Sequence, residues 1–245
     1  MESILEEYII KLGQPLNNHA SVLRIEITGK EPWYWFELKT RGYAAEKFVG
    51  TLCNLGGNWR KSEEKTPLDT LKGEVRGEIK DDRILRELFG NVKQVGDYFS
   101  HVPREVHGNP KQDYPYNFIF SFFEAKIHRS YFSERFDLDE ESFSAEDLER
   151  ALTQVQQYPP AVIRLQQFKE GLEKQICWGY DQVMFSYLKE NYKEFDPKIK
   201  IIEGIEVKKL ESSPETPYKD REMLKYYRSK PAIEDVSDVH TFGMP

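Results

Sequence analysis

Residues 159–192 read PPAVIRLQQFKEGLEKQICWGYDQVMFSYLKENY, and their apolar side chains recur at steps of three and four. This spacing places them along one stripe of an α-helix. Pro159 and Pro160 precede the pattern, where proline is tolerated because the first N–H groups of a helix have no helical partner. An unbroken helix of this length would run about 50 Å at 1.5 Å per residue. We therefore predict one long helix in the C-terminal half, whose apolar side covers a β-sheet. The stripe consists of Leu165, Phe168, Leu172, Ile176, Tyr180, Val183, Met184, Tyr187 and Leu188.

The sheet beneath this helix is predicted from three stretches in which side chains alternate. Residues 117–131 give the strongest strand signal, with phenylalanines on one face early in the run and polar side chains later. Residues 22–27 and 33–38 flank a short turn that contains Gly29, a pattern typical of a hairpin. Further strands are predicted at 71–79 and 198–210.

Helices are predicted at 3–12, 43–55, 82–89 with an extension towards 99, and from Ser144 to the prolines at 159. The order of elements lacks the strict strand–helix alternation of a doubly wound fold. We predict an α+β fold, a mainly antiparallel sheet with helices packed on one or both faces. Residues 1–210 would form a single domain, and 211–245, rich in polar residues and proline, an extended or partly disordered tail.

Composition limits the classes of function. The chain has 245 residues and a formal net charge of −7, which argues against general binding of duplex DNA. Its two cysteines, Cys53 and Cys177, are predicted to be reduced core thiols inside helices. The N-terminus lacks the pattern of a secretory signal, and no apolar run reaches the ~20 residues of a membrane span. A reducing, cytoplasmic location is therefore expected.

Common catalytic motifs are absent. The sequence contains no phosphate-binding P-loop, no dinucleotide fingerprint, no C-x-x-C pair and no G-x-S-x-G elbow. No cofactor is identified by the sequence.

An irregular connection at 100–116 carries the first candidate site. His101 and His107 lie there with Arg104, and histidine exchanges protons near neutral pH. Their spacing matches no zinc signature, so no metal site is predicted. The alternative is that both histidines are simply solvated.

A second polar group lies on the phenylalanine-rich strand. Glu124, Lys126 and His128 alternate there, so they share one face at steps of about 6.6 Å. If they met the two loop histidines in one cleft, they would form an acid–base site, with Arg104 or Lys126 holding an anion. The alternative is an ordinary solvated sheet face.

An aromatic and basic cluster is the third candidate. Trp33, Tyr34 and Trp35 are followed by Lys39 and Arg41, and tryptophan, tyrosine and arginine are enriched at protein interfaces. The alternative is that the aromatic residues belong to the core.

Two functions follow from these patterns. The main prediction is a non-catalytic protein-binding module, an adaptor, assembly or regulatory factor that uses the aromatic surface and the C-terminal tail and has a protein partner. The second is an enzyme with a histidine and carboxylate acid–base site, acting on a small anionic or aromatic ligand. A single-strand nucleic-acid module is a weaker third.

Overall fold

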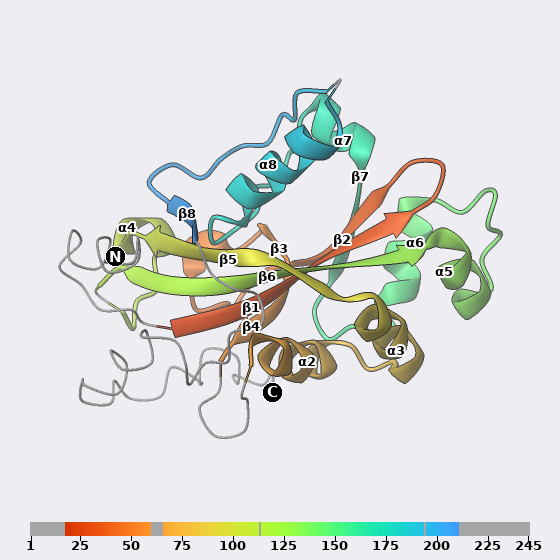
Figure 1. Cartoon of the computed structure of the whole chain (residues 1–245), viewed down its shortest axis with the longest axis horizontal. Coiled ribbons are helices and arrows are strands. Elements are labelled where there is room, and N and C mark those ends of the chain that lie inside the picture. The colour runs from red at the N-terminus through yellow and green to blue at the C-terminus, as the bar shows by residue number, and fades with distance from the viewer. Residues whose placement is uncertain (1–17, 60–65, 113, 194, 211–245) are drawn as a thin grey trace.

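The computed structural model describes residues 18–59, 66–112, 114–193 and 195–210. Its centre is one mixed sheet in the order β3-β2-β1-β6-β5-β8, in which β4 also pairs with β1 and β7 also pairs with β2 (Figure 1). The central pair, β1 and β6, is parallel, and every other pairing of named strands in the described part is antiparallel. The strands are β1 (Asn18–Thr28), β2 (Trp33–Leu38), β3 (Leu52–Cys53), β4 (Leu55–Asn58), β5 (Lys93–Val102), β6 (Tyr116–His128), β7 (Pro160–Arg164) and β8 (Glu206–Leu210).

Helices lie on both sides of this sheet. In Figure 1, α7 and α8 lie above the sheet, α2 and α3 below it, and α5 and α6 near its far end. The predicted α+β class, with a sheet packed between helices, is confirmed. The helical segments are η1 (Glu46–Phe48), α2 (Pro67–Glu78), α3 (Asp82–Asn91), α4 (Arg104–His107), α5 (Arg129–Phe136), α6 (Ala145–Leu152), α7 (Leu165–Glu170) and α8 (Tyr180–Asn191).

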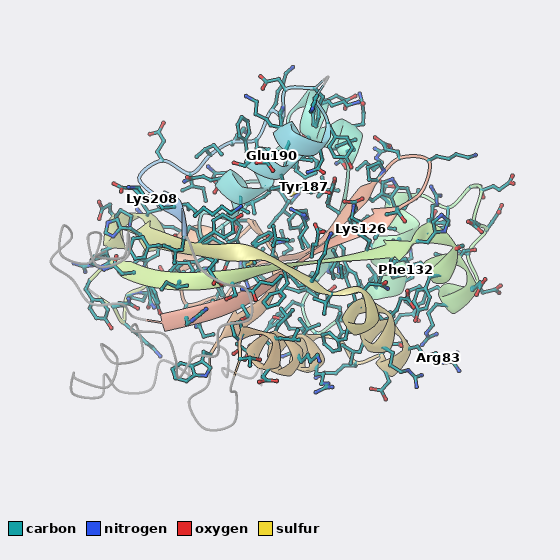
Figure 2. All side chains as sticks on the ribbon, in the orientation of Figure 1. Arg83, Lys126, Phe132, Tyr187, Glu190 and Lys208 are labelled. Carbon is teal, nitrogen blue, oxygen red and sulfur yellow. The ribbon has the colours of Figure 1, made fainter. Side chains whose placement is uncertain are left out.

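Each face of the sheet has its own hydrophobic core. Tyr34 and Phe36 of β2 belong to the core under α7 and α8, whereas Trp33 and Trp35 belong to the core under α2, α3 and α6. Alternating side chains of a strand point to opposite faces, so a strand with two aromatic faces must be covered twice. Figure 2 shows side chains filling both layers, with Phe132 on one side of the sheet and Tyr187 on the other.

The segment that was expected to be one long helix matches that prediction only roughly. Residues 160–164 form β7, and two helices, α7 and α8, follow, separated by residues 171–179. The apolar stripe is nevertheless buried against the sheet: Phe168, Ile176 and Val183 are 0%, 0% and 5% exposed. Gly179 at the start of α8 has φ +84°, and a Cβ there would lie 2.4 Å from Val207 Cγ2, so only glycine fits this turn.

The predicted helix at 43–55 is wrong. Only η1 is helical there, and the chain then enters β3 and β4. The apolar spacing matched a helix, but Gly50 has φ +87°, which interrupts a helix, and residues 52–58 find strand partners on β1 and β2. Cys53 therefore lies in a strand and Cys177 in the turn before α8; both are buried and free.

The predicted strand at 71–79 is also wrong, because these residues belong to α2. Thr66 caps the helix in a capping box with Asp69, and Pro67 occupies its first turn. Gly73 and Gly77 both lie on the exposed side of the helix, away from its buried face.

The remaining predictions of helices and loops are confirmed in part. The helices beginning after Asp81 and Ser144 are confirmed, and each has the side-chain cap expected of those residues. Residues 93–102 form β5 instead of extending α3, and α5 occupies part of the segment expected to be a loop. The predicted helix at 3–12 and the tail at 211–245 lie outside the described residues.

Candidate functional site

The site begins where two neighbouring strands diverge. β1 and β2 pair only through residues 25–27 and 33–35. Beyond that point the segment 52–58 enters between them, pairing first with β2 and then with β1. Asn54 sits at the crossing, between β3 and β4. This divergence brings the end of β2 close to β4 and to the helix that follows it.

Three buried carboxylates gather at the divergence. Glu74 and Glu78 lie four residues apart on α2, which puts them on one face of the helix, and Glu37 comes from β2. Their exposed fractions are 7%, 6% and 0%. Glu78 Oε2 accepts a hydrogen bond from the Gly56 N–H at 3.0 Å. A Cβ on Gly57 would lie 2.3 Å from Glu74 Oε2, so glycine at this position lets the carboxylate approach β4.

One buried lysine accompanies these carboxylates. Lys39 Nζ forms an ion pair with Glu37 Oε1, and the two side chains are 8% and 0% exposed. The same ammonium lies 4.6 Å from the ring centre of Tyr43 and 5.8 Å from that of Tyr158, within the range of cation–π attraction. Aromatic faces and a carboxylate thus take the place of water around this charge.

Burial and charge change the protonation of the cluster. Burial raises the pKa of Glu78 well above its ordinary value, and the Glu37 carboxylate raises it further, while Lys39 and the Gly56 N–H partly offset both. Burial acts to lower the pKa of Lys39, but acidic neighbours, Cys53 and Glu37 among them, more than compensate and raise it well above its usual value. We attribute most of that effect to Glu37, because it touches the ammonium directly. A strongly perturbed carboxyl next to a fixed ammonium is typical of functional sites.

A cavity of about 50 Å³ opens beside the lysine. Since a single water needs roughly 10–15 Å³ measured in this way, the space holds a few waters or one small polar group. Lys39 is the charged residue of the lining, with Asn54 and the backbone of 56–58 beside it. The lining also includes five aromatic residues, Tyr43, Tyr116, Phe118, Trp178 and Tyr180.

Two acceptors near this cavity have no hydrogen-bond partner among the described residues. Asn54 Nδ2 donates to the Leu23 carbonyl at 3.3 Å, which fixes the orientation of the amide and leaves Oδ1 buried and unpartnered. Glu37 Oε2 is unpartnered as well. Buried polar atoms are normally satisfied, so both positions suit a donor supplied by water or by a ligand.

The structure does not gather the three histidines predicted from the sequence in one place. His101 on β5 pairs with Asn117 at the start of β6, and His128 ends that strand. Eleven residues at 3.3 Å each separate the two ends by about 36 Å. His107 is buried in α4, where its ring contacts the Asn109 N–H at 3.0 Å and the Tyr114 carbonyl at 3.2 Å, and burial lowers its pKa.

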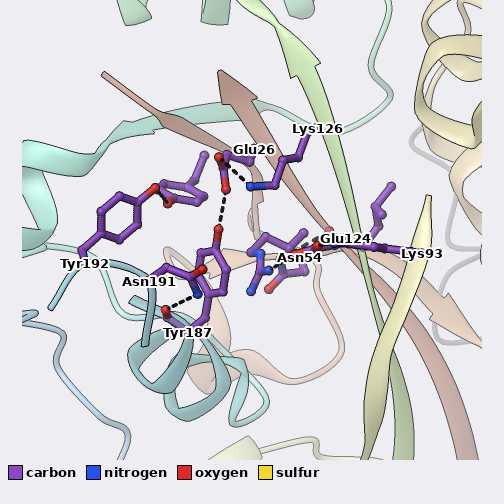
Figure 3. A network of polar contacts seen from close by, with 11 residues as sticks. Glu26, Asn54, Lys93, Glu124, Lys126, Tyr187, Asn191 and Tyr192 are labelled. Atoms are coloured by element: carbon purple, nitrogen blue, oxygen red, sulfur yellow. Dashed lines mark hydrogen bonds and ion pairs between the residues drawn. The ribbon is translucent and has the colours of Figure 1, made fainter. Parts of the chain in front are cut away.

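Glu124 and Lys126 lie under α8 in a polar network that Figure 3 shows. Glu124 pairs with the buried Arg24 and with Lys93 at 2.5 Å. Burial alone would raise the pKa of Glu124, but Lys93 and Arg24 lower it overall.

The second half of this network centres on another carboxylate. Lys126 Nζ lies 3.1 Å from Glu26 Oε1, and the Tyr187 hydroxyl of α8 donates to Glu26 Oε2 at 2.5 Å. The Arg24 guanidinium stacks 3.3 Å from the Tyr187 ring. These contacts attach α8 to the polar end of the sheet.

The predicted binding residues are not gathered either. Trp33, Tyr34 and Trp35 are 5%, 0% and 0% exposed, so they are core residues and form no surface patch. Arg41 and Arg104 are exposed.

Sequence reasoning missed Glu37, Glu74 and Glu78, and noted Lys39 only as a neighbour of the tryptophans. The capping signal at Thr66 and Pro67 would have turned 71–79 into a helix and placed Glu74 and Glu78 on one face. Within the described ranges, no group of three His, Cys, Asp or Glu residues is arranged to hold a metal ion. None of the helices described there is long and apolar enough to cross a membrane.

Comparison with known proteins gives matches only among solved structures. No family model matches the chain, and no curated protein matches it. A mutT/nudix family protein from Listeria innocua is similar at 11% identity and TM-score 0.41, covering 74% of this chain and 99% of that one. A Nudix hydrolase from M. smegmatis, RenU, is similar at 10% identity and TM-score 0.31, covering 62% and 72%. The C. elegans Ap4A hydrolase follows at 7% identity and TM-score 0.29, covering 45% and 69%. At these values the likeness does not assign an activity to this chain.

The prediction of a non-catalytic binding module, an adaptor, assembly or regulatory factor, is wrong. The aromatic surface on which it rested is buried in the core.

Proposed function

We propose that the protein is a hydrolase that acts on a small anionic substrate in the cavity beside Lys39. The observation that carries the proposal is the group of three buried carboxylates, one of them paired with a buried ammonium, next to an open space with unpartnered acceptors. Burying so much charge is costly unless the charges are paired, and stability alone gives no reason to keep it. The small volume of the cavity suits an anionic head group better than a whole ring system.

In this mechanism Glu78 is the acid–base residue. Its raised pKa brings the carboxyl closer to neutral pH, where a general base works best. The ionised form takes a proton from water, and the water oxygen forms a bond to the electrophilic atom of the substrate. The bond to the leaving group then breaks, and the leaving group takes the electron pair. Lys39 offsets the negative charge that develops during attack.

The experiment is a hydrolysis assay of the full chain with three probes: p-nitrophenyl phosphate, Ap4A and the neutral ester p-nitrophenyl acetate. We expect turnover of an anionic probe and none of the neutral ester above background. Glu78→Gln should lower kcat by about 100-fold to 10,000-fold. The matched control is Glu173→Gln, which changes an exposed glutamate and should leave kcat unaltered.

Two outcomes would remove the proposal. One is the absence of hydrolysis of both anionic probes by the wild-type protein. The other is a Glu78→Gln variant that keeps wild-type kcat while remaining folded.

We also keep two broader proposals, a single α+β domain over 1–210 with a separate tail, and a reducing, cytoplasmic location. The two buried cysteines, both free thiols, support the second, which a localisation experiment with the tagged full chain would test.

A further inference from the structure

The two cysteines of the chain lie side by side in the fold. Leu52 forms a parallel bridge with Ile176. The Leu52 N–H donates to the Gln175 carbonyl at 2.8 Å, and the Leu52 carbonyl accepts from the Cys177 N–H at 2.9 Å. Cys53 and Cys177 each follow one member of this bridge, and their thiols hydrogen-bond each other. Backbone and side chains therefore agree that the two thiols are neighbours.

This arrangement suits a disulfide bond. Residues that face each other on neighbouring strands have Cα atoms about 5 Å apart. A disulfide needs Cα atoms roughly 4.4–6.8 Å apart, so the backbone does not have to move for the bond to form. Because the thiols of Cys53 and Cys177 are already in contact, rotation of the side chains brings the sulfur atoms together.

The cavity gives a small oxidant access to one of the two thiols. Cys53 belongs to its lining and is 5% exposed, whereas Cys177 is 0% exposed. A space that holds a few waters also holds hydrogen peroxide. Burial raises the pKa of Cys53 well above its ordinary value, and the Cys177 thiol raises it further, while the Lys39 ammonium acts in the opposite direction. An oxidant thus reaches Cys53 first, and burial makes the reaction slow.

We propose that Cys53 and Cys177 form a reversible oxidation site, which hydrogen peroxide in the cavity converts into a disulfide. The Cys53 sulfur loses its proton and forms a bond to one peroxide oxygen. The O–O bond breaks, and the departing hydroxide takes that proton to become water. The Cys177 sulfur then bonds to the Cys53 sulfur, and the S–O bond breaks. The hydroxyl leaves with the Cys177 proton as a second water, so two thiols are oxidised and one peroxide is reduced.

The disulfide would change one wall of the cavity. It would connect β3 to the turn before α8, where Trp178 follows Cys177 and lines the same cavity. The Trp178 indole N–H already donates to the Tyr43 hydroxyl at 2.9 Å, so the bond adds a covalent link to a wall that is held by hydrogen bonding. Transient disulfides of this kind act as redox sensors in reducing compartments. Neither thiol takes part in the proposed hydrolysis, so the oxidation site does not depend on it.

The test is treatment of the folded full chain with hydrogen peroxide, followed by alkylation in urea and mass spectrometry. We expect wild type to lose both thiols together, with a mass lower by two hydrogen atoms and the peptides of Cys53 and Cys177 joined within one chain. Dithiothreitol should restore both thiols. Circular dichroism during the oxidation verifies that the chain stays folded.

Two matched variants assign the order of the steps. Cys177→Ala removes the second thiol, so a sulfenic acid should accumulate on Cys53 and be trapped by dimedone. Cys53→Ala keeps only the thiol with no exposed surface, which should be oxidised at least about tenfold more slowly than Cys53 in the Cys177→Ala variant. Serine replaces alanine if either variant fails to fold, and the wild-type measurement needs no variant.

Three outcomes would overturn the proposal. The first is a folded wild type that keeps both thiols in peroxide. The second is oxygen added to a single cysteine of wild type without a link to the other. The third is a set of disulfides that join only separate chains. Because no substrate is used, the result is independent of whether the proposed hydrolysis is found.

Discussion

At the scale of single residues, the ion pair between Lys39 and Glu37 dominates the energetics of the site. Both partners are buried, so bulk water does not solvate either charge when the other is removed. Surface ion pairs contribute little to stability, but a buried pair that loses one partner leaves an uncompensated charge. Replacing either residue of the pair therefore changes both the stability of the fold and the charge of the site.

Lys39→Met should lower the free energy of unfolding by about 3–5 kcal/mol, since it leaves the Glu37 carboxylate buried and unpaired. Urea unfolding measures this. The double variant with Glu37→Gln should recover most of the loss, because neither residue then carries a charge. A single variant within about 1 kcal/mol of wild type would mean that the pair is exposed to water in solution.

A second prediction at this scale concerns Asp181 and the dependence of stability on pH. It is fully buried, and burial raises its pKa to about 6 even though the N–H groups of Gln182 and Ile202 donate to it at 2.9 and 2.7 Å. A folded pKa above the ordinary value of 3.8 means that the native state keeps its proton where the unfolded chain has lost it. The contribution of this proton to the free energy of unfolding is complete below the pKa that Asp181 has in the unfolded chain. It is lost as the pH rises through about 6.

The measurement is the urea midpoint at several pH values for wild type and Asp181→Asn. Other carboxylates, such as Asp81, have lowered pKa values and change stability in the opposite sense at lower pH. The prediction therefore concerns the difference between the two proteins. The advantage of wild type over Asp181→Asn should shrink as pH rises through about 6. A difference that is constant across that range would contradict the burial of an ionisable carboxyl at this position.

At the scale of elements, replacing either of two glycines by alanine should change the free energy of unfolding, and in opposite directions, because their surroundings differ. Gly179→Ala puts a Cβ into Val207 at a positive φ, and should cost about 2–4 kcal/mol. Gly77→Ala puts a Cβ into open space on the exposed side of α2 and should add about 0.5–1 kcal/mol. Thermal unfolding of both variants checks this. Equal effects of the two would show that α2 or the turn before α8 differs from the description above.

Alternation and capping explain how much of the fold was predictable. The strands at 22–27, 33–38 and 117–127 follow a period of two, and the helices after Asp81 and Ser144 have capping side chains, so local sequence identifies them. The helix prediction at 43–55 failed because tertiary strand pairing overrode an apolar period. The strand prediction at 71–79 failed because it left out the helix-capping signal at Thr66 and Pro67.

At the scale of the whole molecule, the site depends on a topological feature that no local pattern reveals. The divergence of β1 from β2 lets residues 52–58 enter between them and brings Glu37 next to α2. Of the three predicted histidines, His101 and His128 lie level with opposite ends of β6, and His107 lies in α4. Sequence spacing predicts which residues share a face, but not which strands separate.

The single-domain proposal belongs to this scale. A chain that ends at Leu210 keeps β8 and both cores, so its melting temperature should match that of the full chain. Differential scanning calorimetry of the two chains compares them. A fall of several degrees in the shorter chain would show that residues after 210 are part of the folded domain.

The most direct test of the carboxylate centre is the dependence of kcat/KM on pH for the anionic probe that is hydrolysed. Wild type should gain activity as pH rises, up to an apparent pKa well above the ordinary glutamate value, because Glu78 must lose its proton to act as a base. Glu78→Gln should lose that pH dependence together with most of the activity. An unchanged profile in a folded Glu78→Gln variant would show that the chemistry occurs elsewhere.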